Sequence, residues 1–150
     1  MEKKDLLLVH LREDARQSLT DISKKTHCPI STLFDRLKSY QKRQIITKHT
    51  TLVNFPALGF HCRATIILKV ERDHREEVRS ILLKQERINS LYKINNGYDF
   101  MLESVFETVK DMEDFLEQLE VKFRILDKKA YYIIEELKRE CFLANPDRIF

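Results

Sequence analysis

Apolar residues recur at helical spacing along the first third of the chain and predict three short helices. The first helix is expected over Asp5–Glu13. Ser18 and Asp21 then have the spacing of a capping box, so a second helix is expected to begin there and to end near Lys25. The third is expected over residues 30–43, where an apolar stripe recurs at helical intervals, formed by Ile30, Leu33, Leu37 and Tyr40.

This order of helices, with a tight connection before a longer helix that has a polar, basic outer face, is the plan of a helix-turn-helix. In that motif the longer helix enters the major groove of double-stranded DNA. Arg36 is suited to a bidentate contact with guanine, and Asp35 accepts from cytosine, pairs with an Arg or rejects unwanted sequences. Contacts to bases or phosphates are expected of the smaller polar residues Ser31, Thr32 and Ser39. Phosphate neutralisation is expected of Lys38, Lys42, Arg43 and Lys48.

A break in the pattern separates this helical region from the rest of the chain. Residues 45–53 are rich in β-branched side chains and are expected to be extended, as the wing of a winged helix-turn-helix or as a strand. One of the two glycines and one of the three prolines follow within Asn54–Gly59. We therefore expect a DNA-binding domain at 1–53, a linker at 54–61 and a second domain at 62–150.

The second domain alternates between strand and helix patterns in the order β-α-β-β-α-β, which is the ferredoxin-like order. Strands are expected at 63–70, 88–94 and 100–106 and within 121–137, most clearly at 130–135. Helices are expected at 73–85 and from the capping box of Thr108 and Asp111 onwards. Asn96 and Gly97 predict a hairpin turn. The fold class is therefore α+β, and a homodimer is expected because helices cover only one face of such a sheet.

Charge and composition narrow the function. Residues 1–50 hold eleven Lys or Arg and six Asp or Glu, whereas the whole chain has a net charge of +3. This basic region indicates a polyanionic partner; a solvated face on a structural three-helix unit is the alternative. Two glycines are too few for a Gly-rich nucleotide-binding loop. No apolar run approaches the roughly 20 residues of a membrane span. The three cysteines are scattered, and the N-terminus has no signal-peptide pattern, so a cytoplasmic protein is expected.

No catalytic or metal-binding constellation stands out. His27-Cys28 and His61-Cys62 are adjacent pairs that lack the spacing of a zinc site. A series of acidic residues from Asp111 to Glu120 is better explained as the solvated face of a helix. No set of nucleophile, base and orienting group is evident. We therefore expect no cofactor, no metal and no enzyme activity.

Five short segments give the chain a resemblance to the Lrp/AsnC, or feast/famine, family of transcription regulators. They are Arg16-x-Ser18-x-x-Asp21-Ile22, Ser31-Thr32-Leu33-x-x-Arg36-Leu37, Ile45-Ile46, Pro56-x-Leu58-Gly59 and Gly97-Tyr98-Asp99-Phe100. The resemblance implies a DNA-binding helix-turn-helix joined to a ferredoxin-like regulatory domain. It also implies dimers, and in many members tetramers or octamers.

The resemblance further implies an effector site. Members of the family commonly sense amino acids near a Thr-Gly-x-Tyr-Asp turn, which here corresponds to Asn95, Asn96, Gly97, Tyr98 and Asp99. The chain departs from the family pattern at His27-Cys28, where the helix-turn-helix turn usually has Gly, and at Gly97, which lies one place late. One alternative is a ferredoxin-like dimeric interaction protein that does not bind DNA. Another is a siroheme decarboxylase, an enzyme of similar fold, but the chain lacks Trp and the decarboxylases' Asn-Leu-Trp-Phe segment.

Overall fold

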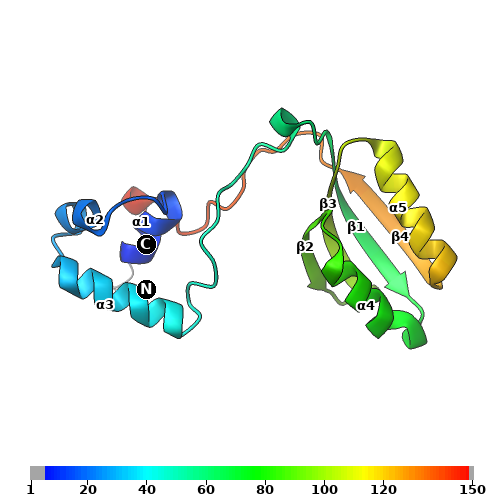
Figure 1. The fold of residues 1–150 in the computed structure, drawn as a ribbon, viewed down its shortest axis with the longest axis horizontal. Helices are drawn as coiled ribbons and strands as arrows, with labels where there is room; N and C mark the ends of the chain where they lie inside the picture. The colour runs from blue at the N-terminus through cyan, green and yellow to red at the C-terminus, as the bar shows by residue number, and fades with distance from the viewer. Residues whose placement is uncertain (1–5, 149–150) are drawn as a thin grey trace. The chain divides into compact units, whose positions relative to one another are not determined.

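The computed structural model describes residues 6–148 and divides them into two units (Figure 1). One unit consists of the described residues within Met1–Leu52 and Leu137–Phe150, and the other is Val53–Glu136. The chain therefore leaves the first unit and later returns to it. This division differs from the predicted second domain at 62–150, because the last residues belong with the N-terminal helices.

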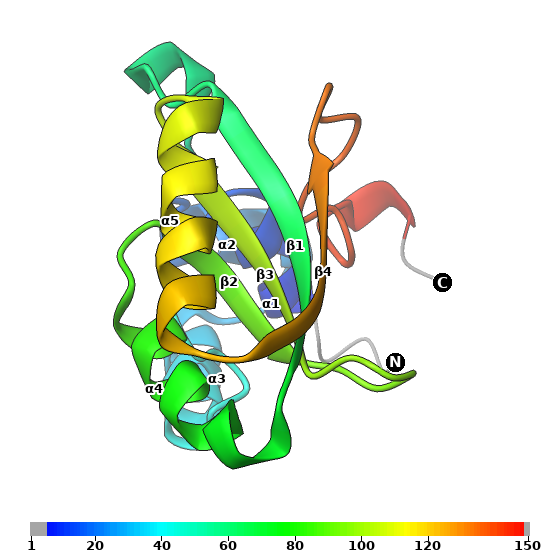
Figure 2. The same ribbon diagram turned by 90° about the vertical axis from the view of Figure 1, so that its right-hand side faces the viewer.

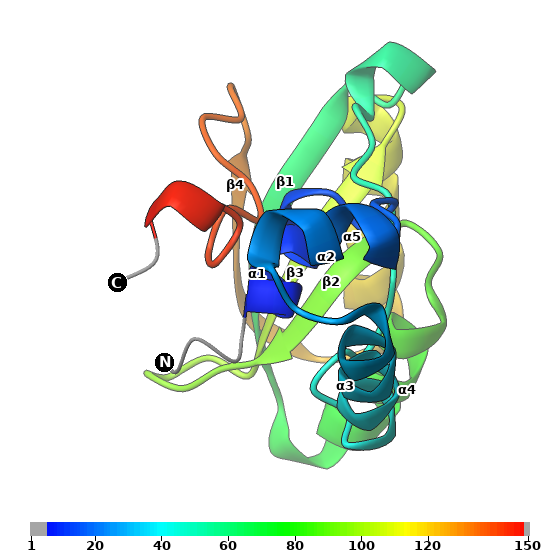
Figure 3. The same cartoon turned by 90° about the vertical axis from the view of Figure 1, so that its left-hand side faces the viewer.

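The first unit contains three α-helices, which are α1 (Leu6–Glu13), α2 (Leu19–Thr26) and α3 (Ile30–Lys42). Asp5, the predicted start of the first helix, lies outside the described residues. The start of α2 is confirmed: the Ser18 hydroxyl accepts the N–H of Asp21 at 3.0 Å and donates to the Asp21 carboxylate at 2.8 Å. The three helices lie together (Figure 3), and the apolar cluster of the unit is formed by buried side chains from them, Leu7, Ile22, Leu33 and Tyr40.

The turn between α2 and α3 holds His27 in the left-handed conformation, with φ 55°. This conformation is uncommon for a residue with a side chain and is usually left to glycine. Two short hydrogen bonds hold the backbone around it. The Ser23 hydroxyl donates to the carbonyl of Cys28 at 2.6 Å, and the Thr26 hydroxyl donates to the carbonyl of Ile22 at 2.8 Å. The turn therefore keeps a glycine-like backbone without a glycine.

Residues 45–53 do not form the predicted wing or strand. The N–H groups of Ile45 and Ile46 both donate to the carbonyl of Tyr40, which closes the end of α3. All four strands of the described chain pair with one another in one sheet of the second unit, and residues 45–53 pair with none of them. β-branched residues favour a strand only where a neighbour can pair with them, and the expectation from composition alone is wrong.

The C-terminal segment, residues 137–148, lies with α1. Arg12 on α1 donates from Nε to the carbonyl of Phe142 at 2.6 Å and from Nη2 to the carbonyl of Glu140 at 3.1 Å. It also pairs with the Glu140 carboxylate at 3.2 Å. A short 3-10 helix, η4 (Pro146–Arg148), is next to α1. One arginine side chain thus ties the segment to the first helix.

The second unit is a four-stranded antiparallel sheet with both of its α-helices on one face (Figure 2). The strand order is β2-β3-β1-β4. Its elements in chain order are η2 (Pro56–Leu58), β1 (Cys62–Val70), η3 (Arg72–His74), α4 (Arg75–Lys84), β2 (Ile88–Lys93), β3 (Phe100–Phe106), α5 (Val109–Lys122) and β4 (Ile125–Tyr132). The predicted succession of strands and helices is confirmed, and the protein is a mixed α and β fold.

The core of the second unit lies between the sheet and its two helices. Even-numbered residues of β1 are buried, and the residues between them are more exposed. Leu102 on β3 pairs with Ile66 on β1, and both pack with Leu82 of α4 and Leu116 of α5 in one cluster. Successive side chains of a strand point to opposite faces, so the more exposed residues lie on the face of the sheet that α4 and α5 do not cover (Figure 2).

The last strand lies within the predicted range of 121–137 but begins before the clearest part of that prediction. The sequence predicts it most clearly at 130–135, whereas β4 is Ile125–Tyr132. Its pairing with β1 extends from Val70↔Ile125 to Ala64↔Tyr132, so its position is set by the length of β1. The charged residues Asp127-Lys128-Lys129 concealed the strand, because an edge strand can present charge to water.

Candidate nucleic-acid interface

One face of α3 points into the core of the first unit, and the other points to solvent. Leu33 and Tyr40 are buried, and Leu37 is half-buried beside them. Eight residues of α3 are exposed: Ile30 and Ser39 lie at the two borders, and the six between them, which we call the outer face of α3, are Ser31, Phe34, Asp35, Lys38, Gln41 and Lys42. Residues three and four apart are neighbours on a helix, so these six form one continuous stripe.

The structure brings four of the predicted DNA contacts together on the outer face, namely Ser31, Asp35, Lys38 and Lys42. Three others are exposed elsewhere along or after the helix, namely Ser39, Arg43 and Lys48. Because α3 ends at Lys42, Arg43 is its C-terminal cap and Lys48 belongs to the segment that follows. Exposed positive charge therefore concentrates toward the C-terminal half of α3.

Thr32 and Arg36 lie on a flank of α3 and are half-buried. Both line a pocket whose other walls include the start of α1 and the turn at His27. The helical spacing explains this placement of Arg36. It comes three residues after Leu33 and four before Tyr40, so it borders the buried row rather than the centre of the outer face.

Phe34 is the apolar residue of the outer face, and the prediction from the sequence missed it. Its side chain is 47% exposed. Lys38 lies one helical turn later, and its Nζ is 4.6 Å from the centroid of the Phe34 ring. A signal was available, because Phe34 lies off the apolar stripe at a position where an amphipathic helix normally has a polar residue.

The predicted effector residues lie in the hairpin between β2 and β3. Asn96 and Gly97 have positive φ values of 63° and 86°, which is the combination that a type I′ turn requires. Both are exposed, as is Asn95 before them. The N–H of Ile94 donates to the carbonyl of Asp99 at 3.0 Å and closes the loop. The hairpin prediction is confirmed.

Tyr98 and Asp99 at the end of this hairpin have partners within the second unit. The Tyr98 hydroxyl donates to the Asp127 carboxylate at 2.7 Å and holds the pKa of that carboxyl below its usual value. The Asp99 carboxylate accepts the N–H of Val70 at 2.8 Å and pairs with Arg75 at 2.9 Å. Asp99 therefore anchors the hairpin to β1 and α4.

The part of the chain that the structure describes has no cluster of three or more His, Cys, Asp or Glu suited to a metal ion. Cys62 of the His61-Cys62 pair is buried, and its Sγ is 3.9 Å from Sδ of Met112. Burial raises the pKa of the Cys62 thiol, and the nearby carboxylates of Glu113 and Asp111 raise it further.

No helix within residues 6–148 has the length and apolar character of a membrane span.

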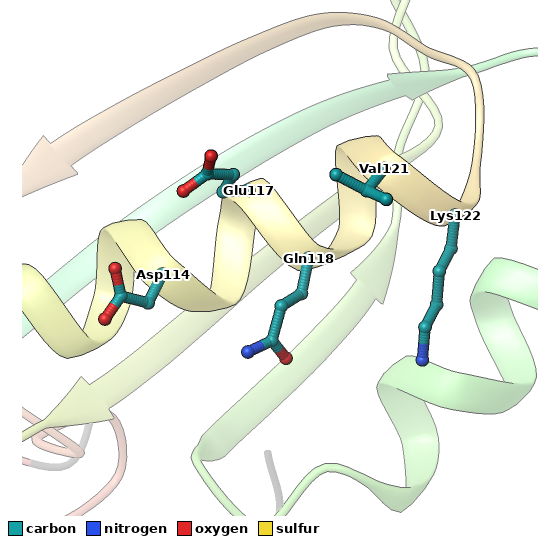
Figure 4. Close-up of a pocket in the computed structure, with 5 residues that line it drawn as sticks. All are labelled: Asp114, Glu117, Gln118, Val121 and Lys122. Atoms are coloured by element: carbon teal, nitrogen blue, oxygen red, sulfur yellow. The ribbon is translucent and has the colours of Figure 1, made fainter.

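A surface pocket lies along α5 (Figure 4), lined by Asp114, Glu117, Gln118, Val121 and Lys122. All five residues come from one helix at intervals of one, three or four residues. They form a helix face that mixes both signs of charge with an apolar residue, and no second element contributes a lining residue. The arrangement therefore provides no convergent set of polar groups of the kind that binds a small ligand.

Comparisons with known proteins relate the chain to transcription regulators. It is 33% identical over 107 residues to the HTH-type transcriptional regulator FL11 of Pyrococcus abyssi, and the match covers 71% of each chain. LrpC of B. subtilis gives a TM-score of 0.83 at 19% identity, with 92% of this chain and 96% of LrpC covered. The regulator NMB0573 of Neisseria meningitidis, solved as an L-Met complex, also gives 0.83, at 18% identity and 93% coverage of each chain. No family model matches the chain.

Proposed function

The chain belongs to the Lrp/AsnC family of DNA-binding transcription regulators, and from this premise we propose that α3 reads the DNA site from the major groove. Its relatives are regulators rather than enzymes, which argues against the siroheme decarboxylase alternative. The observation that carries the proposal is the outer face of α3, which is solvent-exposed along the whole helix.

Charge supports this role for α3. Lys38 and Lys42 lie on the outer face, and Arg43 and Lys48 extend the positive charge beyond the end of the helix. Lys and Arg that neutralise phosphates release counterions from the duplex and supply affinity that does not depend on base sequence. The N-terminal half of α3 is less charged and carries Ser31 and Asp35, which suits contact with base edges.

We assign Arg36 and Thr32 to a different part of the interface. Both are half-buried between α3, the start of α1 and the turn. From this flank the guanidinium of Arg36 reaches a guanine or a phosphate at the border of the groove rather than at its centre. We keep Arg36 as a proposed contact at the edge of the interface, as we do Ser39, which is exposed outside the outer face of α3.

The second unit is proposed to be a ferredoxin-like dimerisation domain. Its β-α-β-β-α-β order matches that unit. On the face without helices, Ile67 pairs with Met101, and Met101 pairs with Tyr92, which is 54% exposed. An apolar group of this kind on an open sheet face suits a second copy of the chain. Two copies would place two α3 helices at half-sites one helical turn, or a multiple of it, apart.

The hairpin between β2 and β3 is the proposed place of an amino-acid effector. The L-Met complex of the Neisseria regulator supports this class of ligand. Exposed backbone groups at Asn95, Asn96 and Gly97 are available to a ligand, whereas the carboxylate of Asp99 already has two partners. A thermal-shift series with the twenty amino acids tests the proposal: one or a few should raise the melting temperature, and no response to any would contradict it.

In-vitro selection from random duplexes tests the role of α3. An enriched, roughly two-fold symmetric motif is expected. Arg36→Ala should cost about 1–3 kcal/mol of binding free energy and relax specificity at one position. Lys42→Ala should weaken binding to all sequences. It should also reduce the slope of log affinity against log salt concentration by about one.

Lys84→Ala is the matched control, because Lys84 is an exposed lysine at the end of α4 in the second unit. It should leave both the affinity and the salt dependence unchanged. If Lys42→Ala and Lys84→Ala behaved alike, the assignment of α3 would be wrong.

A further inference from the structure

We propose that Phe34, oriented by Lys38, reads the 5-methyl group of thymine in the major groove. The proposal rests on the proposed role of α3 as the recognition helix and names the base that this helix selects. Phe34 is not part of the apolar cluster of the first unit, and almost half of its surface is exposed.

A second apolar side chain lies next to it. Ile30 comes one helical turn before Phe34 and is also 47% exposed. The two lie in the N-terminal half of α3, which is the part of a recognition helix that comes closest to the base edges. Both therefore present apolar surface where a duplex would present its bases.

Lys38 makes this surface suit DNA rather than an apolar protein partner. Its Nζ lies 4.6 Å from the centroid of the Phe34 ring, within the range of a cation–π contact. The contact restricts the ring and places a positive charge directly beside it. The rest of the outer face is polar or charged, whereas the buried centre of a protein interface is depleted of charge. An apolar ring with a positive charge beside it is complementary to a base edge next to a phosphate backbone.

The chemistry of the major groove selects the base. Its base edges present hydrogen-bond donors and acceptors, and the apolar exception is the methyl group on C5 of thymine. A phenyl ring offers no hydrogen bond, so it would leave the polar edge of a G·C pair unsatisfied. Against thymine it removes a methyl group from water, and that burial is favourable.

Replacing thymine by deoxyuridine tests this directly, because the exchange removes the methyl group and leaves the hydrogen-bonding edge unchanged. Each thymine of the selected site would be replaced in turn, symmetrically in both half-sites, and the Kd measured for the wild-type protein and for Phe34→Ala. At one position the wild type should lose about fourfold per methyl group, or about fifteenfold for both half-sites. Phe34→Ala should bind the thymine and deoxyuridine forms of that position equally.

Three further variants make the result specific. Phe34→Leu keeps an apolar side chain and should keep part of the thymine preference. Lys42→Ala should bind more weakly overall and keep the full preference, since it lies outside the apolar pair. Ile30→Ala should retain the preference at the Phe34 position. Circular dichroism melting of each variant shows whether the first unit is folded.

The outcomes separate the two proposals. A motif with no deoxyuridine-sensitive position, or with the same sensitivity in wild type and Phe34→Ala, would overturn the role of Phe34 and leave α3 as the recognition helix. Loss of the sensitivity in Ile30→Ala alone would transfer the methyl contact to Ile30 and also overturn it. Failure to select any motif would overturn the proposed function, and the thymine proposal with it.

Discussion

The two units of the protein differ in the interactions that stabilise each of them internally. Among the described residues, the apolar cluster of the first unit contains four buried side chains and that of the second contains fifteen. The second unit also has a ladder of backbone hydrogen bonds between each pair of neighbouring strands. The helices α1 to α3 span Leu6–Lys42, and a domain shorter than roughly 40 residues usually needs support beyond its own core. In this protein the C-terminal segment provides support.

From this difference we expect the first unit, which carries the proposed DNA-binding surface, to be the less stable of the two. Stability varies within a protein, and elements that bind ligands often come from its less stable parts. A ligand that binds only the folded form stabilises it. We therefore expect DNA to raise the stability of the first unit and to leave the second nearly unchanged.

Matched truncations in the two cores should separate the units most clearly. Ile22 and Leu102 are both fully buried, one in each unit, and replacing either by Ala should cost about 2–5 kcal/mol. Ile22→Ala should unfold the first unit and abolish DNA binding, while the second unit keeps its thermal transition. Leu102→Ala should lower that transition. Calorimetry with a DNA-binding assay checks both expectations. A single transition lowered equally by the two variants would show that the two units do not unfold separately.

Removing the tie between α1 and the C-terminal segment should have a smaller effect. Arg12→Ala deletes two hydrogen bonds to backbone carbonyls and one ion pair at a partly exposed site. The first unit should lose about 1 kcal/mol, and amide exchange in residues 140–143 should become faster. Arg79→Ala is the control, because Arg79 makes only a long, exposed pair with Glu76 at 3.6 Å. Equal behaviour of the two variants would show that the tie contributes no stability.

The three cysteines differ in burial, so their reactivity compares the two units without any substitution. Cys141 is exposed, Cys28 is half-buried in the first unit, and Cys62 is buried in the second. Burial also raises the pKa of the Cys62 thiol, which lowers its reactive thiolate fraction. Alkylation followed by mass spectrometry should therefore modify Cys141 first, Cys28 next and Cys62 last. Modification of Cys62 before Cys28 would reverse the inferred order of stability.

The smallest effect is expected at the surface of the second unit. Tyr98→Phe removes the hydrogen bond that lowers the pKa of Asp127, so that pKa should rise toward its ordinary value. Because the folded-state pKa is lowered, the bond stabilises the fold above the ordinary pKa of about 3.9 and is lost as the pH falls through the lower value. Carboxyl titration by NMR measures the change. An unchanged Asp127 titration in Tyr98→Phe would assign the shift to other groups.

Local patterns predicted most of the fold. The capping residues Ser18 and Thr108 begin the helices that they were expected to begin, and Asn96-Gly97 forms the expected turn. These helix starts and this turn depend on a few residues that are close in the sequence, so the local sequence is enough to predict them. The failures depend on distant partners. The start of β4 is set by pairing with β1, and residues 45–53 have no strand to pair with.

The candidate site could likewise be predicted where it depends on spacing along one helix, and not where it depends on residues distant in the sequence. Helical periodicity located α3 and most of its exposed residues, but Arg36 was placed by charge type rather than by its spacing from Leu33 and Tyr40. Counting that spacing puts it on a flank. Phe34 has no charge or hydrogen-bonding group that marks it as a contact, and its spacing off the apolar stripe is the signal that it is exposed. The place of the C-terminal segment could not be foreseen, since the contact between Arg12 and Phe142 joins residues 130 positions apart.

The return of the chain to the first unit has a consequence for the order of folding during synthesis. Residues leave the ribosome from the N-terminus, and domains generally fold as units in that order. Here the three helices emerge first, but the partners of Arg12 emerge only after all of Val53–Glu136 has been made. The second unit can therefore complete its fold while the first still lacks part of its structure. A nascent chain should acquire full DNA-binding competence last, although the residues of α3 are among the first to be translated.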